Sequence, residues 1–207
     1  MKYIITVIIV VSSFLISSAQ NFKGGIMAGM ATSQVDGDTY GGYHRVGLAA
    51  GGFVGLDISK KFAWQLEMKY IQKGSFKKQN PDAGDYGIYK LRLNYIEMPF
   101  MIKYKYKPKI TFDAGLAFGY LAKTKEENEY GQFPENTLIP FHKTEISYQI
   151  GGYYQLYKKI LFNVRYSYSF LSIRQHINGE RLILFQRGQF NNVIVFSFYY
   201  QFNKPDE

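Results

Sequence analysis

Seven charged side chains lie on the polar faces of otherwise apolar stretches, and they have the greatest capacity for chemistry in this sequence. They are Glu67, Lys69, Glu97, Lys103, Asp113, Glu145 and Arg165. Both signs are present, so the side chains can pair if the fold gathers them in one interior. Unpaired buried charges are too costly for most of the seven to lack partners. The sequence therefore predicts a polar network of salt bridges that fixes strand register, with a narrow ion path or a ligand site as the alternative.

Three histidines offer a second kind of chemistry. His44, His142 and His176 all lie in or beside the long polar segments described below, which invites a metal site or a lipid-hydrolase site. No HxH or HxxxH spacing occurs, so the three would have to converge in three dimensions. The glycine pairs match neither GxxxxGK[ST] nor GxGxxG, which argues against a phosphate-binding loop. We predict no catalytic residue, no metal and no cofactor. The three histidines are expected to be exposed in the loops.

The elements that must position these residues alternate apolar and polar side chains with a period of two, which predicts β-strands. Eight segments do so, at residues 22–33, 45–58, 62–73, 89–106, 110–123, 144–157, 160–172 and 189–202. Each is longer than the ~9–11 residues that a tilted transmembrane strand needs. In the 160–172 segment, Phe162 and Val164 share one face while Asn163 and Arg165 share the other. A membrane barrel turns the apolar face to lipid and the polar face to its lumen.

The connections between these segments alternate in length. Short basic turns occupy residues 59–61, 107–109 and 158–159, and long polar loops occupy residues 34–44, 74–88, 124–143 and 173–188. Short turns on one side and long loops on the other are typical of bacterial outer-membrane barrels. The sequence thus predicts an all-β fold: an eight-stranded antiparallel up-and-down transmembrane β-barrel with short periplasmic turns and long extracellular loops.

The 89–106 segment complicates this alternation. Its lower half carries apolar residues on one face: Ile96, Met98, Phe100, Ile102 and Tyr104. Above them, Leu91, Leu93 and Tyr95 have the opposite parity. A β-bulge near Tyr95 would correct the phase; alternatively, the upper half extends beyond the bilayer, where facing matters less. Pro99 cannot donate to a ladder, so a local irregularity is expected there.

The first nineteen residues have the pattern of a signal peptide, which leaves residues 20–207 as the barrel domain. Lys2 precedes a mostly apolar stretch over residues 3–16, and Ser17-Ser18-Ala19 supplies small residues for cleavage. A transmembrane anchor is the alternative, but the stretch is shorter than the ~20 residues needed to span a bilayer. After Ala19 no uninterrupted apolar run exceeds four residues, which excludes a helical inner-membrane protein.

Composition agrees with export to a membrane. The chain has no cysteine, so stability must come from burial or from a closed hydrogen-bond network. Aromatic residues make up 18% of it, with 19 Tyr and 17 Phe, and Tyr suits a membrane interface. Without Lys2, 24 basic residues stand against 16 acidic ones. For an exported chain, that excess favours anionic lipid head groups over nucleic acid as partner.

Two further segments carry hypotheses about partners. Phe196, Phe198, Tyr200 and Phe202 alternate in the last strand and resemble the aromatic signal that barrel-insertion machinery recognises, as well as forming a lipid face. The 173–188 loop contains an apolar run at residues 182–185, which is unusual for an exposed loop. It could extend the flanking strands as a hairpin, with Asn178-Gly179 as its turn, and bind another protein by its edges.

Several segments together resemble the PorT-like outer-membrane β-barrel family. They are residues 25–30, 47–56, 72–74 and, above all, the LNYIEMP stretch within residues 93–104. The resemblance implies an eight-stranded barrel in the outer membrane of a Gram-negative cell, and it brings no catalytic motif. The namesake of the family is implicated in type IX secretion and protease maturation.

The expected function is therefore that of a non-enzymatic integral outer-membrane protein with a structural or protein-interaction role in secretion or surface assembly. Its expected partners are outer-membrane lipids, the insertion machinery, and other envelope or secretion proteins that meet the extracellular loops. A rim-localised lipid-modifying enzyme and a narrow channel are the alternatives.

Overall fold

The computed structural model describes residues 22–133, 139–175 and 188–202. The predicted signal peptide lies outside these residues. Ten elements follow one another along the chain: β1 (Phe22–Asp36), β2 (Arg45–Asp57), β3 (Phe62–Lys77), the 3₁₀ turn η2 (Pro81–Ala83), β4 (Tyr89–Lys107), β5 (Ile110–Asn128), β6 (Gly131–Gln132), β7 (Thr144–Tyr157), β8 (Ile160–Ser169) and β9 (Phe190–Gln201). Among the described residues, no helix is long and apolar enough to cross a membrane.

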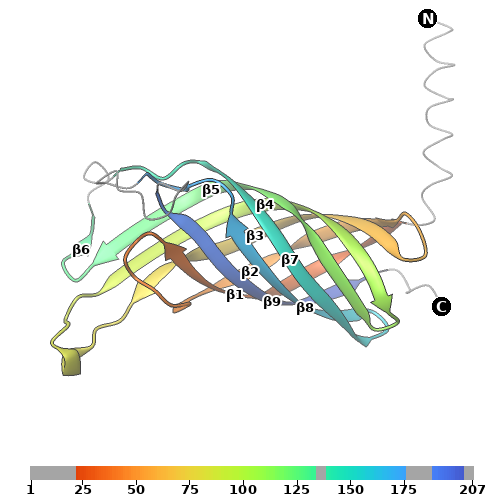
Figure 1. Ribbon diagram of the computed structural model, residues 1–207, viewed down its shortest axis with the longest axis horizontal. Helices are drawn as coiled ribbons and strands as arrows, with labels where there is room; N and C mark the ends of the chain where they lie inside the picture. The colour runs from red at the N-terminus through yellow and green to blue at the C-terminus, as the bar shows by residue number, and fades with distance from the viewer. Residues whose placement is uncertain (1–21, 134–138, 176–187, 203–207) are drawn as a thin grey trace, which may run out of the picture.

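Eight of these strands close into an antiparallel barrel (Figure 1). Each pairs with its neighbour in the chain, β5 passes to β7, and β1 pairs with β9 to complete the circle. β6 only adds two residues to the upper end of β5. Closure matters because lipid offers no hydrogen-bond partner to an unpaired strand edge. The predicted eight-stranded barrel is confirmed.

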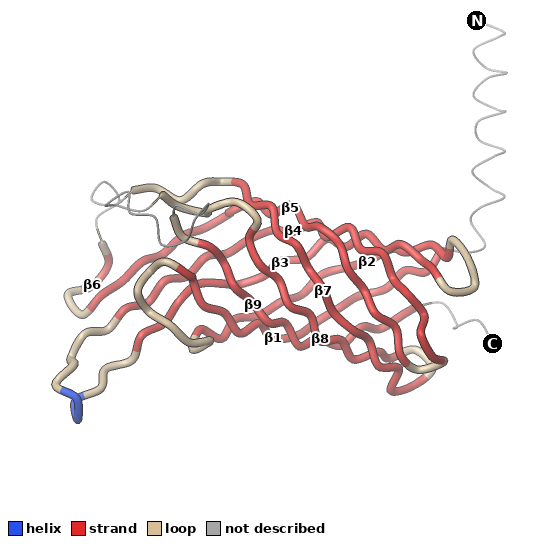
Figure 2. Tube along the Cα trace, in the orientation of Figure 1, coloured by secondary structure: helices blue, strands red, loops and turns tan. Residues whose placement is uncertain are grey.

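The two ends of the barrel differ, as the connection lengths predict. At one end the strands are joined by short turns at residues 58–61, 108–109 and 158–159, and the first and last strands begin and end there. At the other end β3, β4 and β5 run on past their neighbours, and η2 sits at the tip of the β3–β4 loop (Figures 1 and 2). We call these the periplasmic and extracellular ends.

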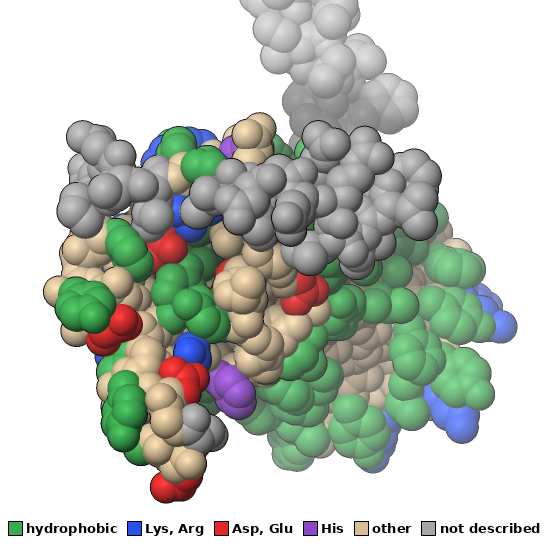
Figure 3. Space-filling view, turned by 60° about the vertical axis from the view of Figure 1, so that its left-hand side comes forward, with side chains coloured by type: hydrophobic (Ala, Val, Ile, Leu, Met, Phe, Trp, Pro, Cys, Tyr) green, Lys and Arg blue, Asp and Glu red, His purple; other side chains and the backbone are tan. Residues whose placement is uncertain are grey.

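Side chains alternate between lumen and exterior along every strand. On β9, Phe196, Phe198 and Tyr200 are each more than 40% exposed, whereas Ser197 and Tyr199 are buried. The wall of the barrel is accordingly covered with hydrophobic side chains, while charged side chains lie toward its two ends, with acidic ones visible at the extracellular end (Figure 3). An exposed apolar surface of this extent is stable only against hydrocarbon.

The predicted phase correction in β4 is wrong, because the parity of that strand never changes. Leu91, Leu93 and Tyr95 point into the lumen, in phase with Glu97 and Met101 below them. They pack there as an apolar core, so the rule of a polar lumen fails in the upper part of the barrel.

The register shift lies in β5 instead. Asn94 faces Lys123 while Tyr95 faces Leu121, which leaves Ala122 as an extra residue in β5. The irregularity expected at Pro99 is confirmed: the β3–β4 ladder is interrupted between Leu66↔Phe100 and Lys69↔Glu97.

The 160–172 and 189–202 segments are shorter strands than predicted, ending at Ser169 and beginning at Phe190. The reason is that Ile173 and Arg174 turn inward over the mouth of the barrel and are buried there. The hypothetical hairpin turn at Asn178-Gly179 lies outside the described residues.

Candidate functional site

The lower half of the lumen is organised around Arg165 of β8. Its guanidinium forms two hydrogen bonds to Glu67 of β3, at 2.9 and 3.0 Å, and a short one to Asp113 of β5. It also donates to the hydroxyl of Tyr153 at 2.8 Å. Glu67 accepts further bonds from Gln65 and from the Tyr199 hydroxyl. A planar donor fork suits this arrangement, since Arg can bind two carboxylates from one position.

The network continues upward through two lysines of β3. Lys69 lies 4.0 Å from Glu67 and 3.4 Å from Glu97, so it joins the lower cluster to β4. Lys73 then bridges Glu97 to Glu145 of β7, with 3.0 Å to a Glu145 carboxylate oxygen. The alternation of signs runs unbroken from Asp113 to Glu145.

Glu145 is also held by two neutral groups from neighbouring strands. The Ser169 hydroxyl donates to Oε1 at 2.8 Å, and the Asn191 amide donates to Oε2 at 2.9 Å. These bonds tie β8 and β9 to β7 at the top of the charged network. Every carboxylate in the chain of ion pairs therefore has a named partner of opposite charge.

The structure places all seven of the charged residues singled out from the sequence in the lumen. Six are buried, and Lys103 lies partly buried at the periplasmic side, where it donates to Gln65 at 2.8 Å and sits over the Tyr153 ring. Sequence reasoning missed Lys73, which is fully buried. With Lys73, four acidic residues face four basic ones. The parity of β3 carries the signal, because Lys73 is in phase with Glu67 and Lys69.

Two glycines leave room for these pairs. Gly151 of β7 lies between Asp113 and Arg165 in register, and a Cβ there would come within 2.8 Å of the Asp113 carboxylate. Gly119 of β5 lies in the same way between Glu97 and Glu145, under the reach of Lys73. In both cases the missing side chain lets charges from the flanking strands meet across a strand.

An aromatic layer separates this network from the periplasmic end. The rings of Tyr153 and Tyr199 lie 5.0 Å apart, and Phe53 packs on Tyr199 at 5.3 Å. Below the layer a vestibule of about 820 Å³ opens toward the short turns. Its wall includes Asp57, which accepts bonds from Lys23 and Lys105, each at 2.7 Å.

The extracellular half of the lumen is filled by apolar side chains. These are Val35, Ile71, Leu91, Leu93, Tyr95, Leu121, Ile173 and Val193, all at most 1% exposed. We call this set the apolar plug. It packs against the upper end of the charged network, where Lys73 is level with Leu93 in register, and the buried hydroxyls of Ser33 and Ser75 lie beside it.

A second ion pair closes the mouth above the plug. Arg174 donates to Glu126 at 3.0 and 3.2 Å and to the carbonyl of Ile139 at 2.6 Å, and its guanidinium lies over the Phe141 ring. The Tyr89 hydroxyl donates to the same Glu126 at 2.7 Å. Sequence reasoning did not find this pair, because its members come from two loop-side segments with no shared periodicity.

The other candidate residues lie apart from this interior. His44 and His142 are exposed on separate loops, and His176 is outside the described residues. No group of three or more potential metal ligands occurs among the described residues. Phe196, Phe198, Tyr200 and Phe202, the predicted assembly signal, all lie on the outer face at the end of the chain where β9 closes on β1.

The arrangement has a clear chemical character. Nearly all of its charged groups are neutralised by each other, and the apolar plug and the Arg174–Glu126 pair cover them from above. Such a network holds strands in register, because a shift by one residue would turn every charge toward lipid.

Replacing Arg165 with Met tests this role. The Arg165→Met variant leaves Glu67 and Asp113 buried without their main partner, so we expect a loss of about 3–5 kcal/mol in the free energy of unfolding. Urea unfolding in lipid vesicles, followed by the fluorescence of Trp64, the single tryptophan, measures it. Adding Glu67→Gln and Asp113→Asn should restore much of the loss. An Arg165→Met protein as stable as the wild type would contradict the account.

Asp38 provides a pH-dependent contact in the extracellular β1–β2 loop. Burial raises the pKa of its carboxyl to about 6, against the hydrogen bond that it accepts from the Tyr40 backbone N–H at 2.8 Å. Between the ordinary pKa near 3.8 and about 6, the folded state holds a proton that the unfolded state has lost. The contribution of Asp38 to the free energy of unfolding therefore increases as the pH falls from about 6 toward 3.8.

The Asp38→Asn variant should consequently be more stable than the wild type at pH 7.5, where the buried carboxylate is charged. The difference should vanish near pH 4, where both side chains are neutral. Urea unfolding of the two proteins at both pH values checks this, and an equal difference at the two values would refute it.

Comparisons with known proteins agree with this architecture. Residues 16–175 match the model of the outer membrane protein beta-barrel domain. No curated protein matches the chain. Among solved structures, the attachment invasion locus protein Ail of Yersinia pestis, crystallised with the heparin analogue sucrose octasulfate, is 11% identical. The match covers 88% of this chain and 99% of Ail, with a TM-score of 0.50.

Neisserial surface protein A is 10% identical, over 87% of this chain and 97% of its own, again with a TM-score of 0.50. At these identities the likeness concerns the fold. The family match covers most of the sequence and coincides with the closed barrel and its apolar wall. The chain belongs to the outer membrane protein beta-barrel domain family, and it resides in the outer membrane.

Proposed function

We propose that this chain is a non-enzymatic outer-membrane protein that presents an extracellular sheet to another envelope or secretion protein. The observation that carries the proposal is the extension of β3, β4 and β5 beyond the rest of the barrel. The role in secretion or surface assembly follows from the PorT-like resemblance of the sequence.

The extension is a sheet with open edges. Pairing of β3 with β4 continues to Lys77↔Tyr89, whereas pairing of β2 with β3 stops at Ala49↔Ile71. On the other side, pairing of β5 with β7 stops at Tyr120↔Thr144, although β5 continues to Asn128. Above these levels only the two-residue β6 adds to the sheet among the described residues. Open strand edges are a common place for a partner to add a strand.

Two tyrosines stand at the tips of this sheet. Tyr86, in the β3–β4 loop, is 66% exposed, and Tyr130, in the β5–β6 turn, is 90% exposed. Exposed tyrosines offer a large contact area and a hydrogen-bonding hydroxyl, and they are frequent among the residues that dominate interfaces. We propose that these two tyrosines anchor the partner protein to the sheet.

The interior supports a role without transport. The apolar plug occupies the path that ions would follow, and the charged groups of the lumen are engaged with each other. This favours the interaction role over the narrow channel.

Affinity capture from detergent-solubilised outer membrane tests the proposal. We expect the tagged wild type to enrich an envelope or secretion protein that the Tyr86→Ala, Tyr130→Ala double variant loses. Tyr157→Ala is the matched control, since Tyr157 is 72% exposed but lies at the periplasmic end. Identical captured proteins for the double variant and the wild type would contradict the proposal. If a strain that lacks this protein also showed altered acylation of its lipids, the result would favour the lipid-modifying enzyme instead.

A further inference from the structure

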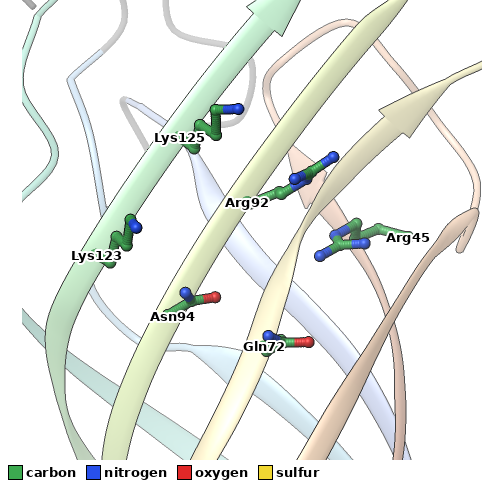
Figure 4. Close-up of a pocket in the computed structure, with 6 residues that line it drawn as sticks. All are labelled: Arg45, Gln72, Arg92, Asn94, Lys123 and Lys125. Carbon is green, nitrogen blue, oxygen red and sulfur yellow. The ribbon is translucent and has the colours of Figure 1, made fainter.

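The outer wall carries a basic pocket at the upper border of the lipid-facing belt. Its volume is about 390 Å³, and six side chains line it: Arg45, Gln72, Arg92, Asn94, Lys123 and Lys125. They come from β2, β3, β4 and β5 and lie beside one another (Figure 4), five of them in outward-facing rows and Arg45 at the end of β2, opposite Ser33 in register. We call these six residues the basic shelf.

The border is sharp, because three strands change from apolar to polar at the same level. Tyr70, Ile96 and Tyr120 are neighbours in register across β3, β4 and β5, and each is at least 40% exposed. The next outward row in the same register is Gln72, Asn94 and Lys123, and above it Arg92 faces Lys125. The shelf therefore begins where the apolar belt ends, at the depth of lipid head groups.

The β-bulge at Ala122 creates this row. With regular alternation after Tyr120, Thr124 and Glu126 would point outward and Lys123 and Lys125 inward. The extra residue reverses the parity, so that the two lysines join Asn94 and Arg92 outside. The same reversal turns Glu126 inward to Arg174. One irregularity thus supplies both the closed mouth and the basic shelf, as expected of a bulge that re-aims side chains.

The charge of the shelf is only partly balanced. Glu127 lies 3.7 Å from Arg92 and also pairs with Lys125. Within the described part of the chain, no ion pair is formed by Lys123 or by Arg45, and the buried Nε of Arg45 has no hydrogen-bond acceptor. Four cations with one contacting carboxylate leave an excess of positive charge beside the membrane. Such a cluster matches a phosphate group, which Arg can bind through two parallel hydrogen bonds.

We propose that the basic shelf binds the phosphate-bearing head group of a lipid in the outer leaflet. Its acyl chains would lie along the apolar belt formed by Tyr70, Ile96 and Tyr120, directly below the shelf. A head group with both a phosphate and attached hydrocarbon meets both surfaces at once, whereas free phosphate meets only the cations. The inference is independent of the protein partner proposed above.

Binding of bis-phosphorylated lipid A to the purified mature protein in detergent micelles tests this. The test variant carries Arg92→Gln, Lys123→Gln and Lys125→Gln. Each basic side chain near an anionic surface contributes roughly a fivefold factor to affinity, so the triple variant should bind about a hundredfold more weakly. The matched control carries Lys60→Gln, Lys109→Gln and Lys158→Gln, which remove the same charge from the exposed periplasmic turns. The control should bind as the wild type does.

Two further probes separate the sources of phosphate. Dephosphorylated lipid A should bind the wild type as weakly as the triple variant binds the intact lipid, and inorganic phosphate should fail to displace the lipid. Equal weakening in both triple variants, or ready displacement by inorganic phosphate, would overturn the proposal. The heat-dependent shift in gel mobility verifies folding. If the triple variant fails it, Lys123→Gln alone should weaken binding about fivefold, and an unchanged affinity would overturn the proposal.

Discussion

The absence of hydrogen-bond partners in hydrocarbon is the constraint on which the rest of this structure depends. It forces the sheet to close, which it does through the pairing of β1 with β9. Every second side chain of each strand then points into the lumen, and a barrel of eight strands has a lumen just wide enough for side chains to fill. Charges placed there cannot be solvated. They are tolerated because Arg165, Lys69 and Lys73 stand between carboxylates from four strands.

The barrel meets two environments, and its side chains change accordingly. Within the belt, apolar residues face out and the charged network faces in, whereas above the belt polar residues face out and the apolar plug faces in. The upper part therefore resembles the core of an ordinary soluble protein. The bulge at Ala122 lies at this transition on β5. Because of it, Lys123 and Lys125 point outward and Glu126 points inward.

Much of this could be predicted from the sequence, because a period of two needs only the polarity of each residue. That pattern placed the eight strands and the seven lumen charges, and the connection lengths gave the up-and-down order. Lys73 escaped because apolar Ile71 separates it from Lys69 on the same face. For Leu91 and Leu93 the sequence left two alternatives, a bulge in β4 or an upper half beyond the bilayer, and the unchanged parity of β4 agrees with the second. The bulge was expected in β4, where the pattern breaks, but it lies in β5. The Arg174–Glu126 pair and the basic shelf join residues that only the closed barrel brings together.

The most direct test uses single cysteines along β9, which is possible because the native chain has none. Nitroxide labels at positions 195–200, in protein folded into bilayers, report collisions with oxygen and with a water-soluble nickel complex. Labels replacing Phe196, Phe198 and Tyr200 should collide often with oxygen and rarely with nickel. Those replacing Val195, Ser197 and Tyr199 should be shielded from both. Frequent nickel collisions at the first three positions would place that face in water, and at the last three they would reveal a wet, open lumen; either result would contradict a closed barrel packed with its own charges.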